Sequence, residues 1–338
     1  MKAGISGLGM ITPFGVGVEH FWQGLRGRRK PQYVMELIDL AQGQRELGMF
    51  KAVAEGLKDY ISPALLRRID PLAQKALLCS ILALKDAGIV DDTNKNIGIV
   101  TGTGYGCLNA SFNFQDSLID YGDSAPSPTD FINSVHNSIC AQISIALKIT
   151  GPVTTISSFE LTTAQVIETA AAWLKQDSCD YVFACIGDEN HMLRNYATAL
   201  FKEGCAQDDV VYEPGEFFVS FVLSKDDNAK YGCIKEIQSS GFDYGVGCTV
   251  QYTLEISQGN SGSEPSLSSE LSGIERICGY SPCVDALYLC AAAVIKSKQV
   301  TLSGKAIGRQ ERIIIKRGKD KCFQNYIITG GKCLKHSH

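Results

Sequence analysis

The chain has 338 residues, of which 45% are hydrophobic, and its formal net charge is −4. This apolar content is enough for a large core, built as one big domain or as two closely packed halves of a soluble globular protein. The basic residues are scattered over a chain of negative net charge, which argues against a nucleic-acid-binding protein.

The sequence shows no sign of a membrane or an export signal. No apolar run reaches the roughly 18 residues that a transmembrane helix needs, and the N-terminus MKAGISGLGMITPFG lacks the pattern of a signal peptide. We therefore expect a cytoplasmic protein. The 13 cysteines include no C-x-x-C pair, so they are predicted to be small buried hydrophobic residues rather than disulfides or zinc ligands.

Residues 3–26 predict a short strand, a loop rich in glycine and proline, and a helix with Phe21, Trp22 and Leu25 facing inward. The loop does not fit a dinucleotide-binding fingerprint, because Thr12 stands where the third glycine should be. A basic group follows, which is either a solvated loop or a docking site for an acidic carrier protein: Arg26, Arg28, Arg29 and Lys30.

Residues 72–87 predict a helix that ends at Gly88 and has one apolar stripe: Ala73, Leu77, Ile81 and Leu84. A strand over residues 97–100 then enters the run TGTGYG. This run lacks the Lys-Ser/Thr ending of a phosphate-binding loop, so its glycines are expected to let two backbones approach closely.

The next predicted helix covers residues 108–122, with three apolar residues on one face and a fourth nearby: Phe114, Leu118 and Tyr121, with Phe112. The segment SAPSPTDF, which contains Phe131, precedes Asn137 and a further helix. These aromatic residues suit either core packing or an interface.

The stretch over residues 151–174 predicts a strand, a tight corner and a helix. Glu160 occupies the corner, near the positive end of the helix dipole, where many enzymes place a nucleophile. A carboxylate there can accept hydrogen bonds, but it cannot hold an acyl chain as a thioester as cysteine does. The alternative is a glutamate that caps a structural helix.

The run EFFVSFVL at residues 216–223 predicts a central, fully buried strand. Beyond it we expect strands over 233–237, 312–316 and 326–329, a helix over 282–296, and a loose segment over 245–272. Within the loose segment, residues 258–273 are polar and predicted to be mobile. Two strand-and-helix halves of unequal length, residues 1–230 and 231–338, fit a duplicated α/β architecture.

Together these segments resemble the β-ketoacyl synthases, the condensing enzymes of fatty-acid and polyketide synthesis. The likeness is carried by the run GPVTTI before the corner, the alanine-rich helix, the strand CDYVFA, the SAPSPTDF and Asn137 region, and the opening turn: Gly7, Gly9, Thr12, Pro13 and Gly15. The resemblance implies a thiolase-like, duplicated α-β-α-β-α layered fold with a shortened C-terminal half. It also implies that the aromatic helix lies at a dimer interface and reaches the partner's acyl tunnel.

The resemblance also shows which catalytic groups are replaced. The family's nucleophilic cysteine matches Glu160, one catalytic histidine matches Tyr280, and a lysine matches Glu275. The T-H-G-T-G-T motif of the other histidine is missing, and only Asn325 remains of the terminal G-F-G-G-x-N loop. None of the five histidines lies in a matching segment, and the most interior-looking, His136, is expected to be a core residue.

A retained fold with replaced catalytic groups resembles the chain length factor subunits of type II polyketide synthases, and the short chain is nearest to the partners found in aryl polyene systems. This implies a pseudoenzyme without cofactor or metal that heterodimerises with an active ketosynthase and shapes its tunnel, the carrier protein docking through the partner. Two alternatives stay open: a malonyl-carrier-protein decarboxylase or acyltransferase that uses Glu160, and a homodimeric scaffold or binding protein.

Overall fold

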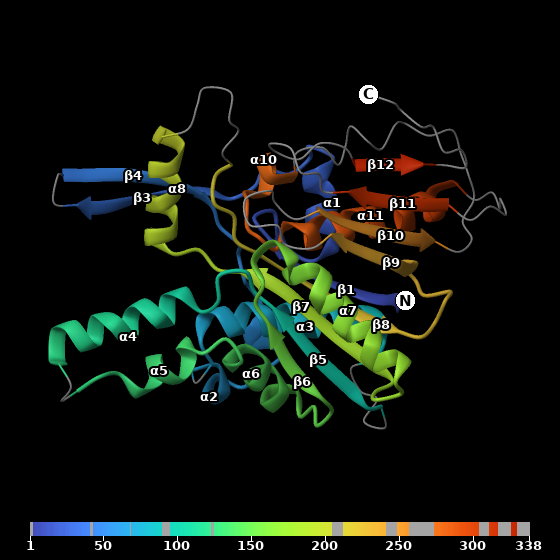
Figure 1. Ribbon diagram of the computed structural model, residues 1–338, viewed down its shortest axis with the longest axis horizontal. Helices are drawn as coiled ribbons and strands as arrows, with labels where there is room; N and C mark the ends of the chain where they lie inside the picture. The colour runs from blue at the N-terminus through green and yellow to red at the C-terminus, as the bar shows by residue number, and fades with distance from the viewer. Residues whose placement is uncertain are drawn as a thin grey trace.

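The computed structural model describes residues 3–40, 43–67, 69–89, 95–122, 125–204, 212–240, 249–256, 274–303, 311–316 and 326–329. A large mixed β-sheet crosses the molecule and is covered by helices, as Figure 1 shows. Two pairs of elements project from the same side of this body: the β3–β4 hairpin with helix α8, and the arm formed by helices α4 and α5 (Figure 1).

The strands of the large sheet follow the order β12-β11-β10-β9-β1-β8-β7-β5-β6, and β2 pairs with β1. Their bounds are β1 Ala3–Thr12, β2 Gly15–Val16, β5 Ile97–Gly102, β6 Val153–Ile156, β7 Tyr181–Asp188, β8 Phe217–Ser224, β9 Cys233–Ser240, β10 Thr249–Ile256, β11 Glu311–Lys316 and β12 Tyr326–Thr329. Strands β5, β6 and β7 are parallel, whereas β8 runs antiparallel to β7 and β1. The carboxyl ends of β1, β5, β6 and β7 therefore meet the start of β8 at one end of the sheet.

Strand β8 lies between β7 and β1 and is buried along its whole length, which confirms the predicted central strand. Its side chains alternate between two core clusters, as the two-residue period of a strand requires. One cluster includes Val219 and Phe221 with helices α7 (Thr162–Lys175) and α11 (Val284–Ser303). The other includes Phe218 and Val222 with α3 (Pro71–Ala87) and α6 (Ser138–Leu147). Burial on both faces explains why this strand has no polar alternation.

Helix α3 forms where the sequence predicts it, and its four stripe residues are buried. Asp70 caps its first turn by accepting a hydrogen bond from the backbone N–H of Leu72 at 2.9 Å. Gly88 ends it with φ +72°, a left-handed conformation that glycine adopts without steric cost.

The remaining elements are α1 Val18–Leu25, η1 Leu57–Asp59, α2 Pro63–Leu66, α4 Leu108–Tyr121, α5 Pro128–Ser134, η3 Phe159–Leu161, α8 Met192–Gly204, α10 Ile274–Cys278, β3 Tyr33–Leu40 and β4 Gly43–Phe50. Helix α4 packs mainly on α5. The sequence reasoning missed the β3–β4 hairpin and helix α8. These two elements lie at the periphery and pack on one another, and apolar side chains of β3 are exposed rather than buried in the main core: Tyr33, Met35 and Leu37.

One prediction for the later part of the chain is wrong. Residues 245–272 were expected to be loose, yet Thr249–Ile256 form strand β10, paired on one side with β9 and on the other with β11. The run TVQYTLEI lies among glycines and serines, but its own β-branched and aromatic residues suit a paired strand. The segment 258–273, predicted to be mobile, lies outside the described residues.

Two further expectations concern the chain as a whole. The division at residue 230 stays a prediction, because β9 pairs with β1 and carries the same sheet across that boundary. The nine cysteines in the described ranges are all buried and free, which confirms their predicted packing role there. Among the helices in these ranges, none combines the length and apolar character needed to span a bilayer.

Candidate functional site

The corner at Glu160 has the predicted architecture. Strand β6 ends at Ile156, the short helix η3 carries Glu160, and α7 begins at Thr162. Phe159 has φ +45°, which is strained for a bulky side chain, and its ring packs edge-on against Tyr105 with centroids 6.2 Å apart. The helix-cap alternative is not the contact observed, because the cap residue of α7 is Leu161, which makes no side-chain cap bond.

Glu160 instead contacts Tyr280. The Tyr280 hydroxyl donates a hydrogen bond to Glu160 Oε1 at 3.0 Å, and both residues are partly exposed. The structure thus brings together two positions that the sequence singled out separately. A carboxylate with a phenol supplies neither a thiolate to carry an acyl chain nor an imidazole for proton transfer.

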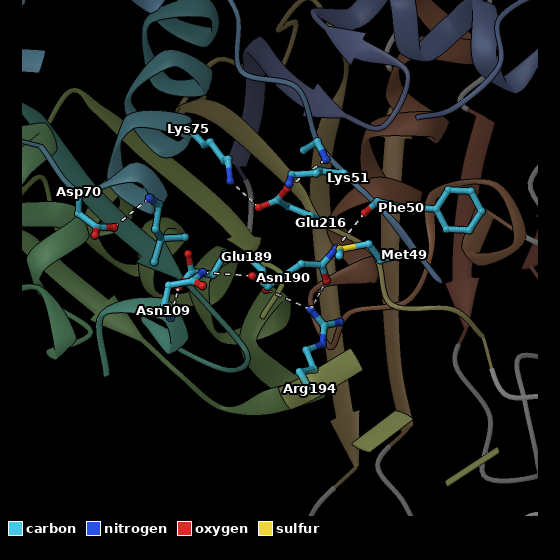
Figure 2. A network of polar contacts seen from close by, with 12 residues as sticks. Met49, Phe50, Lys51, Asp70, Lys75, Asn109, Glu189, Asn190, Arg194 and Glu216 are labelled. Atoms are coloured by element: carbon cyan, nitrogen blue, oxygen red, sulfur yellow. Dashed lines mark hydrogen bonds and ion pairs between the residues drawn. The ribbon is translucent and has the colours of Figure 1, made fainter. Parts of the chain in front are cut away.

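Arg194 on α8 fixes the backbone of the Tyr280 segment. Its Nη2 donates to the Tyr280 carbonyl at 2.6 Å, while Nη1 donates to the Glu189 carbonyl and to Asn190 Oδ1, each at 3.2 Å. The guanidinium also lies over the Tyr105 ring, 4.5 Å from its centroid. Figure 2 shows Arg194 reaching toward Asn190 from below. Helix α8 therefore supports one partner of the Glu160–Tyr280 pair.

Asp188, at the end of β7, is a fully buried acceptor for two segments. Its Oδ1 accepts from Thr103 Oγ1 at 2.7 Å, from the Gly104 N–H at 2.8 Å and from the Tyr105 N–H at 3.1 Å. Its Oδ2 accepts from Ser281 Oγ at 2.6 Å. This one carboxylate therefore holds the glycine-rich run and the segment after Tyr280 against each other.

The glycines of TGTGYG permit this close packing. A Cβ on Gly104 would lie 2.6 Å from Pro282 Cβ, and a Cβ on Gly102 would lie 2.6 Å from Val166 Cγ2. The run does pack closely, but the expectation that it approaches a second backbone is wrong, because the groups approached are side chains.

Two more buried carboxylates lie at the same end of the sheet, as Figure 2 shows. Glu216 accepts from Lys75 Nζ at 2.5 Å and from the Ala52 N–H at 3.1 Å. Glu189 accepts from the Asn109 N–H at 2.9 Å, and burial raises the pKa of its carboxyl to about 7. The sequence pattern did not single out Asp188, Glu189 and Glu216 as site residues. The available signal was their position, directly after or before an apolar strand.

The other replaced positions lie apart from Glu160 or outside the described residues. Glu275 is buried and accepts a hydrogen bond from the hydroxyl of buried Tyr288 at 2.5 Å. Asn325 falls outside the described ranges. His136 is exposed rather than interior, because it lies in the turn before α6 and not within a packed helix. No cluster of three metal-ligating side chains occurs among the residues that the structure places.

The aromatic candidates form contacts along the arm. Phe112 stacks on His191 with centroids 4.3 Å apart, and Phe114 lies 5.2 Å from Phe131. Leu118 is half-buried and Tyr121 is exposed, and within α4 only Ala110 is fully buried. The stripe of Phe114, Leu118 and Tyr121 is therefore not a core stripe within this chain.

Comparison with known sequences identifies the family of this chain. The profile of the family described as "Beta-ketoacyl synthase, N-terminal domain" matches residues 3–203, which is more than half of the chain. The chain belongs to the β-ketoacyl synthase family. The match includes β1, β5, β6, β7 and Glu160, but not Tyr280 or Glu275.

The curated relatives that match this chain have low sequence identity to it. It is 28% identical over 183 residues to 3-oxoacyl-[acyl-carrier-protein] synthase 2 of Vibrio cholerae, covering 53% of this chain and 44% of the relative. It is 29% identical over 168 residues to the tetracenomycin polyketide synthase ketoacyl synthase alpha subunit of Streptomyces glaucescens, covering 46% and 38%. The matches span less than half the length of these relatives.

Solved structures share the fold at low sequence identity. The ishigamide ketosynthase/chain length factor matches with a TM-score of 0.55 at 16% identity, covering 71% of this chain and 67% of that one. A type II polyketide synthase acyl-carrier protein in complex with its ketosynthase matches with a TM-score of 0.56 at 16% identity, covering 71% and 68%. The thiolase-like α/β fold expected from the sequence is confirmed.

Proposed function

We propose that this chain is a non-catalytic subunit, similar to a chain length factor, that pairs with an active β-ketoacyl-acyl-carrier-protein synthase. It stabilises that enzyme and contributes to the wall of its acyl tunnel in type II polyketide or fatty-acid-like synthesis, in a system of the aryl polyene kind. The single observation that carries the proposal is the contact between Glu160 and Tyr280.

Condensation needs a thiolate that accepts the acyl chain and groups that stabilise the enolate formed from the extender unit. At the cysteine position this chain has a carboxylate, and its hydrogen-bond partner is the tyrosine at a histidine position. Arg194 and Asp188 fix the backbone and the neighbours of that tyrosine. A site so ordered around a non-nucleophilic pair suits a structural role better than a chemical one.

The side of the molecule where β6 lies has features that favour contact with a partner subunit. Strand β6 ends the sheet order and has a neighbour on one side only within the described strands. An uncovered edge with apolar side chains beside it favours pairing with another chain. Such side chains occur on α6 and η3, where Ile145 and Phe159 are exposed, and on the arm, where Ile119, Phe131 and Ile132 are exposed.

Two of the structural neighbours fit the same proposal by their descriptions, one being a ketosynthase/chain length factor and the other a ketosynthase with its acyl-carrier protein. For this chain, contact with a carrier protein is expected through the partner. The basic group that follows α1 is exposed throughout, so a direct contact there remains a testable alternative: Arg26, Arg28, Arg29 and Lys30.

The first test is co-expression with an active type II ketosynthase that has an intact cysteine and histidines, chosen from the same genome. We expect a 1:1 complex in size-exclusion chromatography and native mass spectrometry. Separate elution of the two proteins at micromolar concentration would overturn the proposal. A stable homodimer that does not bind the ketosynthase would favour the scaffold alternative instead.

The second test concerns chemistry. Glu160→Ala and Glu160→Gln in the complex should leave condensing activity within a few-fold of the original. A loss of about a hundredfold, or about 2.7 kcal/mol in transition-state stabilisation, would instead make Glu160 a catalytic residue. Release of carbon dioxide from malonyl-carrier protein by the isolated chain, abolished in Glu160→Ala, would replace the proposal with the decarboxylase alternative.

A further inference from the structure

Strand β3 is an open edge of the two-stranded sheet that projects beside α8 (Figure 1). Among the described strands it pairs only with β4, in an unbroken register from Tyr33 opposite Phe50 to Leu40 opposite Gly43. The backbone N–H and C=O groups that point away from β4 therefore have no strand partner in the described part of the chain. An edge of eight residues is long enough for an added strand to form a ladder along it.

This edge lacks the usual features that prevent strand addition. Its sequence, YVMELIDL, contains no proline and no lysine, and its register with β4 shows no bulge. Its two carboxylates are bonded to side chains from the β4 side of the hairpin. Glu36 pairs with Lys51 at 3.5 Å, and Asp39 accepts from Gln44 Nε2 at 2.8 Å. Both charges therefore already have a partner away from the open edge.

One face of β3 is both apolar and exposed. Tyr33, Met35 and Leu37 alternate along it, with 45%, 53% and 57% of their surfaces exposed. The face is ordered, because the Tyr33 ring packs edge-on against Phe50 with centroids 5.0 Å apart, and Gly48, opposite Met35, leaves room for the Tyr33 hydroxyl. An added strand would extend this face and cover apolar side chains that water now contacts.

Positive charge lies at the start of the edge. The loop before β3 exposes Arg28, Arg29 and Lys30, and no ion pair in the described part of the chain involves them. Arg29 is held in place, since its Nε donates to the Phe14 carbonyl. The far end of β3 carries the exposed Asp39. A segment that lies along β3 would therefore meet positive charge at one end and negative charge at the other.

We propose that β3 is a docking edge for an extended segment of a partner protein, which adds a strand along β3 and carries acidic residues at the end beside residues 28–30. Apolar side chains at alternate positions of that segment extend the face of Tyr33, Met35 and Leu37. The inference does not depend on the proposed function, because β3 belongs to a different sheet from β6, whose edge is assigned there to the partner subunit.

Two other occupants fit these observations less well. A membrane surface offers charge and apolar contact, but its hydrocarbon has no groups that pair with an open backbone edge. A second copy, with β3 paired antiparallel to β3 about its midpoint, would bring the two Glu36 carboxylates close together, and like charges on facing strands repel. An acidic segment of another protein satisfies the backbone edge, the apolar face and the basic loop together.

Synthetic peptides test the strand addition directly. The probe is a short labelled peptide with a run of aspartates at one end followed by alternating valine and threonine, and fluorescence anisotropy follows its binding to the full chain. We expect saturable binding that weakens as salt is added. A peptide with lysine in place of aspartate should bind at least about tenfold more weakly. Of two peptides methylated at the odd or at the even backbone nitrogens, only the one whose methyl groups face β3 should lose binding.

Variants of the chain locate the contact. Met35→Lys places a charge on the apolar face, and Arg28→Glu reverses a charge in the loop, so each should weaken peptide binding by about tenfold. Each has a matched control at an exposed residue elsewhere: Ile145→Lys on α6 and Lys58→Glu on η1. The controls should change binding by less than about twofold. Melting curves confirm that all four variants fold.

Three results would overturn the proposal: no saturable binding of the peptide, equal binding of both methylated peptides and the parent, or variants that bind the peptide as their controls do. Two further results would assign the edge to a different occupant. Co-sedimentation with phosphatidylserine vesicles that Arg28→Glu abolishes would indicate a membrane surface. A dimer in native mass spectrometry that Met35→Lys abolishes would indicate a second copy of this chain.

Discussion

The Tyr280 hydroxyl lies 3.0 Å from Glu160 Oε1, although the two residues are 120 positions apart in the chain. The contact joins η3, at the end of β6, to the segment that follows α10. It links the part of the chain that the family profile matches to the part beyond that match. The contribution of this contact to the free energy of unfolding can be measured with variants of the two residues.

Removing the Tyr280 hydroxyl should cost little stability, because the pair is partly exposed. We expect Tyr280→Phe to lower the free energy of unfolding by about 1 kcal/mol. Glu160→Gln should cost less, since the amide oxygen still accepts from the phenol. Urea unfolding of Tyr280→Phe, of Glu160→Ala, which removes the acceptor, and of their combination gives the coupling energy. Strictly additive effects of the two changes would show that the hydrogen bond contributes nothing.

The buried pair of Lys75 and Glu216 should have a much larger effect. Glu216→Ala leaves the part-buried Lys75 ammonium and the buried Ala52 N–H without their acceptor, so the free energy of unfolding should fall by about 3 kcal/mol, the low end of the range for a buried pair. Adding Lys75→Met should recover part of the loss by removing the unpaired charge. Glu36, which pairs with Lys51 at the surface, gives the matched control, since Glu36→Ala should cost less than about 1 kcal/mol.

Changes in α4 should alter product length more than rate if the arm reaches the partner's tunnel. Alanine at Phe112, Phe114, Leu118 or Tyr121, tested in the complex, should lengthen the product distribution where the side chain blocks a growing chain. Because none of the four is fully buried in this chain, each change should cost less than the roughly 3 to 5 kcal/mol of a buried phenylalanine.

Product analysis by mass spectrometry and a melting curve of each complex separate the two effects. Ser111→Ala, at the position before Phe112 on the same helix, serves as a control for the fold of α4. Unchanged product length in all four variants would mean that the partner closes its own tunnel and that this subunit only supports it.

Cysteine reactivity should be low in the folded chain. All nine described cysteines are buried, and burial raises the pKa of the Cys107 thiol to about 12. At pH 8 the thiolate fraction of such a group is about one in ten thousand. Alkylation mapped by mass spectrometry should therefore label these nine sites only after unfolding. Rapid labelling of Cys107 in the native protein would contradict the burial of this residue just before α4.

Some of the features behind these predictions can be predicted from the sequence, and others cannot. The central strand β8, helix α3 and the strand, corner and helix around Glu160 were predictable, because each places apolar residues at its own period and carries a cap or breaker beside it. The identity of residue 160 was equally local, since its replacement of a cysteine follows from the run GPVTTISSFE alone.

The contacts made across the end of the sheet depend on the tertiary structure. The sequence gives no sign that Tyr280 meets Glu160 or that Asp188 joins Thr103 to Ser281, since strand order brings these positions together across long stretches of chain. The exposure of His136 and Tyr121 also depends on packing between elements. Local pattern sets which face of an element is apolar, whereas topology sets what that face meets.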